Sequence, residues 1–166
     1  MVTSVGASRR SLRRRSSSEC KEPRGALVDA WYARDVDSAL ASRIIADYYG
    51  ARPGIAAVYL FGSVARGSAR PDSDVDVAVL YQTAPPPTFV GQPFAEQADL
   101  SEQLGRPVQV VALNSAPVDL VHRVLRDGIL VSEPDKSRRI AFEVRARNQY
   151  FDLLPMLREY RKRVGS

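Results

Sequence analysis

One segment of the chain, residues 58–80, constrains the fold more than any other part of the sequence. It begins within a continuous apolar run at residues 55–61, whose length and bounding turn residues favour a strand buried on both faces. A polar stretch at 62–73 follows, and a second apolar run then extends over 74–81. The segment therefore predicts two strands of a buried sheet, joined by a turn that contains glycine, serine and arginine residues.

Helix and strand signals on either side of this segment predict a small sheet with helices packed on it, of either the α/β or the α+β class. Asp35 or Asp37 can cap a helix that runs to Tyr49, and Gly105 and Gly128 stand where two later helices should end. The expected elements are a helix to residue 49, strands at 55–61 and 74–81, a proline-rich loop at 83–93, a helix at 94–104, a strand at 107–113, a helix at 117–126, a short strand at 129–131 and a long C-terminal helix over about 135–163. Asp135 is expected to cap this last helix, and the helix is expected to kink before Pro155.

The net charge of +5 belongs to the beginning of the chain. Residues 1–25 hold seven bases and two acids, and the rest holds 17 of each. This Ser/Arg-rich leader lacks the apolar residues needed to offset ordering entropy, so we interpret 1–25 as disordered and 26–166 as the folded domain. Beyond non-specific contact by the leader, nucleic acid binding is not expected. With one cysteine, Cys20, and no apolar run of membrane-spanning length, a cytoplasmic protein is expected.

Two aspartates at the start of the second strand are the first candidate site residues. Strand side chains alternate between faces, so Asp74 and Asp76 should point the same way. Neighbouring carboxylates repel each other unless a cation lies between them, and Mg²⁺ often binds one or two carboxylates together with substrate phosphates. Asp74 and Asp76 are therefore predicted to bind a divalent cation such as Mg²⁺. The plainer alternative is an Asp-x-Asp pair that occurs by chance.

The turn before the second strand supplies a candidate phosphate site. Gly62 permits a tight turn directly after a buried strand, and the backbone amides that follow, with the Ser63 hydroxyl, can face a phosphate group. Arg66 can add charge-assisted hydrogen bonds to phosphate oxygens. We predict that Gly62, Ser63 and Arg66 form a phosphate-binding site beside the aspartate pair.

The combined pattern resembles the signature of the nucleotidyltransferase superfamily related to DNA polymerase β. Gly62-Ser63, ten intervening residues and Asp74-x-Asp76 match that signature, and the sequences GSVARG and SDVD are similar to its minimal nucleotidyltransferase branch. Residues 142–160 also resemble the terminal helix of the antitoxin members of that branch. The resemblance covers about residues 37–163.

This resemblance implies the nucleotidyltransferase fold, an α+β fold with a small mixed sheet. It also implies a Mg²⁺-dependent transfer of a nucleoside monophosphate, AMP from ATP or its equivalent from another NTP, to a hydroxyl group. By the same analogy Gly62, Ser63 and Arg66 bind the nucleotide, while Asp74 and Asp76 hold Mg²⁺ and are the catalytic residues. In the antitoxin members the acceptor is a tyrosine of a toxin of the HEPN ribonuclease type. A HEPN-type toxin is therefore the expected protein partner.

One residue departs from the family pattern. The family has a third carboxylate on its third strand, and this chain has Gln109 at that place. A neutral amide cannot act as a general base, and it binds a second cation more weakly than a carboxylate does. Gln109 therefore leaves open a catalytically weak or inactive antitoxin that neutralises its partner by contact. A separate alternative, an enzyme that modifies a small molecule such as an aminoglycoside, also stays open.

Two further features are given ordinary structural roles. His122, the only histidine, is interpreted as a partly packed or surface residue rather than a catalytic base. The aromatic and apolar side chains of the last helix are expected to pack mostly on the sheet. The side chains towards the end of this helix could instead form a surface that contacts a partner, because aromatic residues and methionine are enriched at interfaces.

Overall fold

The computed structural model describes residues 37–50, 52–70, 72–86 and 93–164, except for the side chains of residues 157, 158 and 160–164. The expected leader, residues 1–25, therefore lies outside the described residues, as does Asp35. In chain order the elements are α2 (Ser38–Gly50), β1 (Ile55–Phe61), α3 (Gly62–Ala65), β2 (Val75–Tyr81), α4 (Phe94–Leu104), β3 (Val108–Ala112), α5 (Val118–Asp127), β4 (Ile129–Ser132) and α6 (Lys136–Val164).

The four strands form one mixed sheet in the order β3-β2-β1-β4. β1 runs antiparallel to both β2 and β4, whereas β2 and β3 are parallel. The two strands predicted from the 58–80 segment thus lie at the centre of the sheet. This arrangement, with its long C-terminal helix, confirms the predicted α+β fold.

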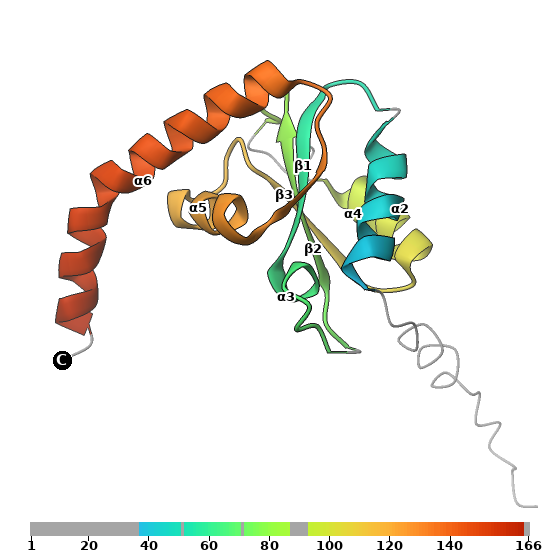
Figure 1. Cartoon of the computed structure of the whole chain (residues 1–166), viewed down its shortest axis with the longest axis horizontal. Coiled ribbons are helices and arrows are strands. Elements are labelled where there is room, and N and C mark those ends of the chain that lie inside the picture. The colour runs from blue at the N-terminus through green and yellow to red at the C-terminus, as the bar shows by residue number, and fades with distance from the viewer. Residues whose placement is uncertain (1–36, 51, 71, 87–92, 165–166) are drawn as a thin grey trace, which may run out of the picture.

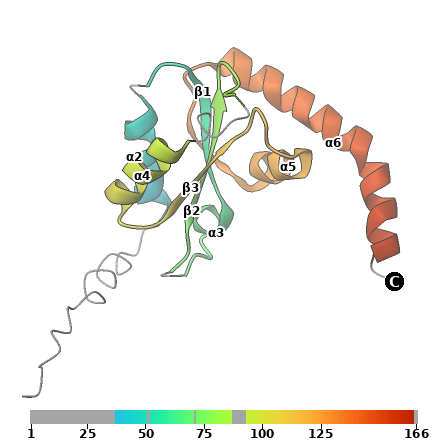
Figure 2. The ribbon, with the colours of Figure 1, turned by 180° about the vertical axis from the view of Figure 1, so that it is seen from behind.

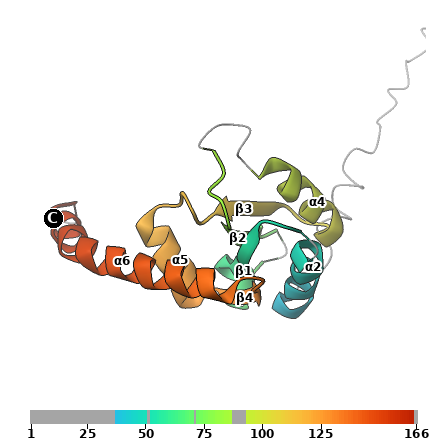
Figure 3. The same ribbon diagram turned by 90° about the horizontal axis from the view of Figure 1, so that it is seen from above.

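Helices cover both faces of the sheet. Figures 1 and 2 show α2 and α4 on one side and α5 and α6 on the other, and Figure 3 shows the same two layers from above. Because strand side chains alternate, Leu60 and Val77 lie in the core under α2 and α4, while Tyr59 and Ala78 lie in the core under α5 and α6. Asp76 shares the parity of Ala78 and therefore belongs to the α5 side.

The predicted helix ends are largely confirmed. The Oδ1 atom of Asp37 accepts a hydrogen bond from the Leu40 amide at 2.7 Å, and that of Asp135 accepts one from the Arg138 amide at 3.0 Å. Gly105 ends α4 in the left-handed conformation, with φ 63°. Two details differ from the prediction: Val118–Asp127 begins one residue after Pro117, and a short helix, α3, lies within the connection that was expected to be only a turn.

The C-terminal helix continues through Pro155 without interruption, as Lys136–Val164. Proline removes one backbone hydrogen bond inside a helix and usually kinks it. Figure 1 shows that α6 curves along its length and extends past α5, away from the sheet. Within the described residues, every helix lacks the long apolar stretch that a bilayer crossing requires.

Hydrogen bonds between tyrosines and glutamates fix the helices to the sheet. The Tyr49 and Tyr81 hydroxyls both donate to Oε2 of Glu96, at 2.7 and 2.8 Å, which ties α2 and β2 to α4. On the other face the Tyr59 hydroxyl donates to Oε1 of Glu143 at 2.9 Å, which ties β1 to α6. These bonds satisfy polar atoms that burial would otherwise leave without partners, so the layers around the site are firmly positioned.

Candidate functional site

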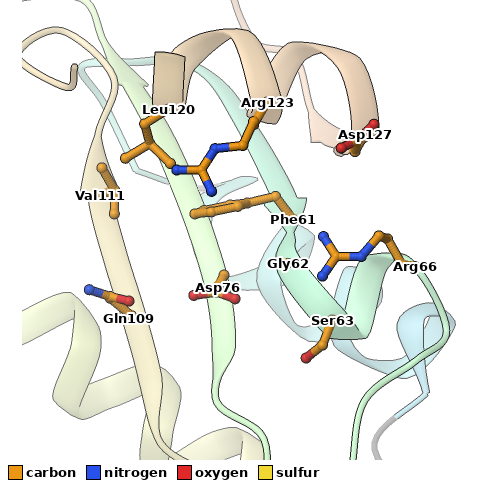
Figure 4. A pocket seen from close by; sticks show the side chains of 10 residues that line it. All are labelled: Phe61, Gly62, Ser63, Arg66, Asp76, Gln109, Val111, Leu120, Arg123 and Asp127. Carbon is orange, nitrogen blue, oxygen red and sulfur yellow. The ribbon is translucent and has the colours of Figure 1, made fainter. Parts of the chain in front are cut away.

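A pocket of about 440 Å³ lies where β1 ends, between the α3 turn and α5. Figure 4 shows Asp76 between Gln109 on one side and the turn that carries Ser63 and Arg66 on the other, with Arg123 reaching over Phe61 from above. The lining residues are Phe61, Gly62, Ser63, Arg66, Asp76, Gln109, Val111, Leu120, Arg123 and Asp127. The structure therefore brings together four of the five predicted site residues.

The glycine of the turn is required by its contact with Asp76. Gly62 follows Phe61, which is paired in register with Asp76 on β2. Its φ is 76°, and a Cβ atom at this position would overlap Oδ2 of Asp76 and lie only 2.8 Å from its Cγ atom. Only a residue without a side chain allows the backbone to turn this close to the carboxylate. The prediction of a tight turn at Gly62 is confirmed.

The α3 turn directs polar groups at the pocket. Phe61, at the N-cap of α3, has an extended backbone and offers no side-chain hydrogen bond to the amides that follow. Uncapped amides at the start of a helical turn can donate to an anion. The Ser63 and Arg66 side chains line the pocket from the same turn. The turn therefore combines backbone donors, a hydroxyl and a cation on one side of Asp76.

The electrostatics around Asp76 favour a bound cation. Burial raises the pKa of the Asp76 carboxyl above its usual value of 3.8, the Asp74 charge raises it further, and Arg66 lowers it. Asp74 is exposed, directly precedes β2 and is not among the residues that line the pocket. A half-buried carboxylate beside a second carboxylate is a setting in which a divalent cation removes the repulsion.

The residue that departs from the family pattern stands directly beside Asp76. Gln109 on β3 is paired in register with Asp76 on β2, is exposed and lines the pocket. The nearby Asn114 has a different role, because its side chain accepts a hydrogen bond from the Tyr81 amide and donates one to the Tyr81 carbonyl, both at 3.0 Å. Gln109 is therefore the neutral oxygen donor adjacent to the aspartate.

Sequence reasoning missed the contribution of α5 to the pocket. Leu120, Arg123 and Asp127 line it from this helix. Arg123 is loosely held, with one guanidinium nitrogen 4.0 Å from the exposed Asp119 carboxylate, and Asp127 accepts two hydrogen bonds from Arg126. The spacing of Asp119, Arg123 and Asp127 at every fourth residue is a sequence signal for one charged helix face. The spacing by itself does not predict that this helix face lines the pocket.

His122 lies on another side of α5. Its ring stacks on that of Tyr150 in α6, with 3.6 Å between the ring centroids and parallel planes. It does not line the pocket. This packing agrees with the prediction that His122 is a partly packed residue.

The described part of the chain offers few oxygen donors for a divalent cation. Over the described residues, no cluster of three or more histidine, cysteine, aspartate or glutamate side chains has the geometry of a metal site. The carboxylates of Asp74 and Asp76 are the donors that could hold Mg²⁺, which commonly takes only one or two protein carboxylates and completes its shell with phosphate and water. The residues present fit that kind of magnesium site, with the bound nucleotide as part of it.

Comparison with known families identifies this part of the chain. The profile of the family described as Polymerase beta, Nucleotidyltransferase matches residues 44–137, a range that includes every residue lining the pocket. Among curated protein sequences, none matches the chain.

Solved structures share the fold. A chain from the crystal structure of a toxin–antitoxin with AMP-PNP superimposes with a TM-score of 0.66 and 23% identity, over 75% of this chain and 98% of that one. The complex of a tri-AMPylated HEPN toxin with an MNT antitoxin from Shewanella oneidensis gives a TM-score of 0.62 and 22% identity, over 77% and 98%. A chain of the MntA-HepT toxin–antitoxin gives 0.61 and 22%, over 77% and 99%.

Proposed function

The chain belongs to the Polymerase beta nucleotidyltransferase family, and from this premise we propose that it transfers AMP from ATP to a hydroxyl group of a partner protein. The proposed partner is a toxin of the HEPN type, for which the chain is the antitoxin. Structural neighbours that are described as toxin–antitoxin complexes, one of them AMPylated and one with AMP-PNP, support this proposal. The reaction would take place in the cytoplasm, where ATP is available.

The contact between the Gly62 turn and Asp76 is the observation that carries the proposal. It sets an anion-binding turn directly against a carboxylate whose pKa is raised, so that a phosphate and a cation can occupy one pocket. Arg66 and Arg123 supply positive charge on two other sides of that pocket. A pocket that accommodates a polyphosphate and its counter-ion is what nucleotide transfer requires.

Each group has a role in this reaction. Gly62 and Ser63 bind the triphosphate through backbone amides and the hydroxyl, and Arg66 binds its oxygens. Asp74 and Asp76 would hold Mg²⁺, which neutralises charge on the phosphates when it is bound. The acceptor oxygen forms a bond to the α-phosphorus, the bond to the β-phosphate oxygen breaks, and pyrophosphate leaves. Gln109 can orient the acceptor hydroxyl but cannot take its proton, so that proton passes to solvent and the step is slow.

The test is transfer of label from α-labelled ATP, with Mg²⁺, to the protein encoded beside this chain. We expect labelling by the wild type and none by the variant Asp74→Asn/Asp76→Asn. Asp72→Asn is the matched control, because Asp72 is an exposed aspartate of the same connection and does not line the pocket. Labelling by the double variant would contradict the proposal, as would no labelling by the wild type with any of the four NTPs.

Neutralisation by contact is the second candidate function, and the position of Gln109 favours it. The neutral amide is directly beside Asp76, and the other carboxylate that lines the pocket, Asp127, is hydrogen-bonded to Arg126. If contact is sufficient, cells that express the toxin should survive equally well with the wild type and with the Asp74→Asn/Asp76→Asn variant. Survival with the wild type alone would assign the function to catalysis.

A further inference from the structure

The charges of the chain are strongly separated between α6 and the part that precedes it. Residues 136–164 contain nine bases and three acids, whereas residues 26–135 contain eight bases and 14 acids. The helix therefore carries a formal charge of +6, next to a preceding part of −6. A single helix with this excess of bases attracts acidic surfaces over a distance that salt limits to about 10 Å.

The first half of α6 is held by the sheet and by α5. Phe142 and Ala146 pack on the core between these layers, Glu143 accepts the hydrogen bond of Tyr59, and Tyr150 stacks on His122. These residues recur every three or four positions, as expected for a helix face that packs against one layer. This face accounts for the placement of α6 as far as residue 150.

The second half of α6 continues beyond these supports. Figures 1 and 3 show the helix extending past α5, away from the sheet. We call residues 151–164 the overhang. Three of its apolar side chains are exposed, Phe151 at 63%, Leu153 at 37% and Met156 at 68%, while Leu154 is half-buried. The spacing of Ala146, Tyr150 and Leu153 continues in the sequence at Leu157, Tyr160 and Val164, whose side chains lie outside the described set.

A helix of this kind gains little stability on its own. Isolated helices shorter than about 12–15 residues are marginal in water, and a proline within a helix removes a backbone hydrogen bond. The overhang is 14 residues long and contains Pro155. An apolar surface on such a segment is best explained by a second protein that covers it.

We propose that the overhang is the docking surface for the partner protein, and that the partner presents an apolar groove with acidic residues along its rim. The inference rests on the proposed function only in assuming that a protein partner exists. Charge complementarity with the helix selects the acidic rim, since α6 carries +6 in all and the overhang itself has four bases and two acids. Phe151, Leu153 and Met156 select the apolar groove. The stacked pair His122–Tyr150 joins the base of the overhang to α5, the helix that lines the pocket, so a docked partner lies one helix away from the nucleotide site.

Two other occupants fit the charges and exposures less well. A symmetric pair of chains joined through their α6 helices would bring +6 against +6, which is repulsive. A nucleic acid would match the basic residues, but it gains nothing from burying large aliphatic side chains such as Leu153 and Met156. A protein with an acidic and apolar surface satisfies both features.

The test compares two matched pairs of substitutions in the full chain. Leu153→Ser/Met156→Ser alters the overhang, and Ile140→Ser/Val144→Ser removes apolar side chains of similar exposure, 43% and 51%, from the supported half of the same helix. The dissociation constant for the purified protein encoded beside this chain is measured by calorimetry. We expect the overhang variant to bind at least about tenfold more weakly, because most binding energy resides in a few buried apolar contacts. The control should remain within about twofold of the wild type.

Three outcomes would overturn the proposal: unchanged binding by the overhang variant, equal weakening by the control pair, or no binding by the wild type. Two further assays assign the surface to another occupant if they are positive. One is sedimentation of the chain alone, where self-association lost in the overhang variant indicates a second copy. The other is anisotropy of a labelled RNA or DNA oligonucleotide. Binding by Asp74→Asn/Asp76→Asn is measured in parallel and should equal that of the wild type. Binding without transfer by the wild type would count against the enzyme and not against the docking surface.

Discussion

The carboxylate of Asp76 occupies the space that a side chain at Gly62 would need. The contact follows from the register of the sheet, in which Phe61 is opposite Asp76 and the chain turns immediately afterwards. A positive φ at Gly62 makes the turn possible. The two halves of the sequence motif are therefore one structural unit, because the position of the Asp76 carboxylate requires a residue without a side chain at the turn.

Replacing Gly62 with alanine should damage both the fold and the site. A non-glycine residue at this φ costs on the order of 1–3 kcal/mol, and the overlap with Asp76 adds to that cost. We expect a lower free energy of unfolding in urea, together with weaker ATP binding, because the displaced Asp76 can no longer lie against the turn.

Gly67→Ala is the matched control for that experiment. Gly67 also has a positive φ, 66°, but a Cβ atom there would meet nothing within 4 Å. The difference between the two variants isolates the contact with Asp76 from the backbone strain. Equal destabilisation by both variants would show that the contact has no energetic role.

Asp76→Asn should stabilise the metal-free protein while abolishing transfer. The raised pKa of Asp76 means that its charged form is disfavoured in the folded state. The destabilisation is therefore present at neutral pH, fades as the pH falls through the raised pKa, and is absent below about 3.8. Because the group is partly solvated, we expect a gain below about 1 kcal/mol. It is measured by thermal unfolding in EDTA at pH 7, and added Mg²⁺-ATP should raise the melting temperature of the wild type only. A less stable variant in EDTA would contradict this account.

Most of the fold could be predicted from local patterns. The run at 55–61, the caps Asp37 and Asp135 and the αL glycine Gly105 each follow from short-range chemistry, and all are found as expected. The path of the last helix beyond Pro155 could not be predicted. A proline inside a helix has a known free-energy cost, but that cost does not determine whether the helix ends, kinks or continues. The short helix α3 was not among the expected elements, because it lies within the polar stretch 62–73, whose composition is typical of a loop.

The site was predictable on the strand side and not on the helix side. Alternation along β2 places Asp76 on one face, and the adjacent strand brings Gln109 beside it. Arg123 and Asp127 enter the pocket because α5 crosses the end of β1, and that crossing depends on packing between elements distant in sequence. The assignments of Asp74, Asp76, Gly62, Ser63 and Arg66 to metal and nucleotide remain predictions for the assays described above.

Gln109→Asp should strengthen the binding of divalent cations together with nucleotide. The new carboxylate would stand next to Asp76 in the parallel ladder and supply the charge that the amide lacks. We expect Mn²⁺-ATP to bind about tenfold more tightly, which corresponds to about 1.4 kcal/mol, and the metal-free variant to be less stable because two carboxylates then repel each other. Calorimetry with Gln103→Asp, the same charge change at an exposed position on α4, is the control. Unchanged Mn²⁺-ATP affinity would place the metal away from Gln109.

The attachment of α6 to the sheet should weaken in acid through Glu143. Burial acts to raise the pKa of this carboxyl, but hydrogen bonds from Arg139 and Tyr59 outweigh it, and the pKa is lowered below the usual 4.5. The stabilisation is therefore present above pH 4.5 and is lost as the pH falls through the lower pKa of the folded state.

Glu143→Gln tests this account at two pH values. At pH 7 the variant should lose about 1–3 kcal/mol in free energy of unfolding, because the half-buried Arg139 and the Tyr59 hydroxyl both lose a charged partner. At a pH below the lowered pKa of Glu143 the wild type and the variant should converge, because the carboxyl is then protonated. Urea unfolding at both pH values provides the measurement, with Asp152→Asn as an exposed acid on the same helix for comparison. A difference between wild type and Glu143→Gln that stays constant with pH would mean that the carboxylate charge does not hold α6 in place.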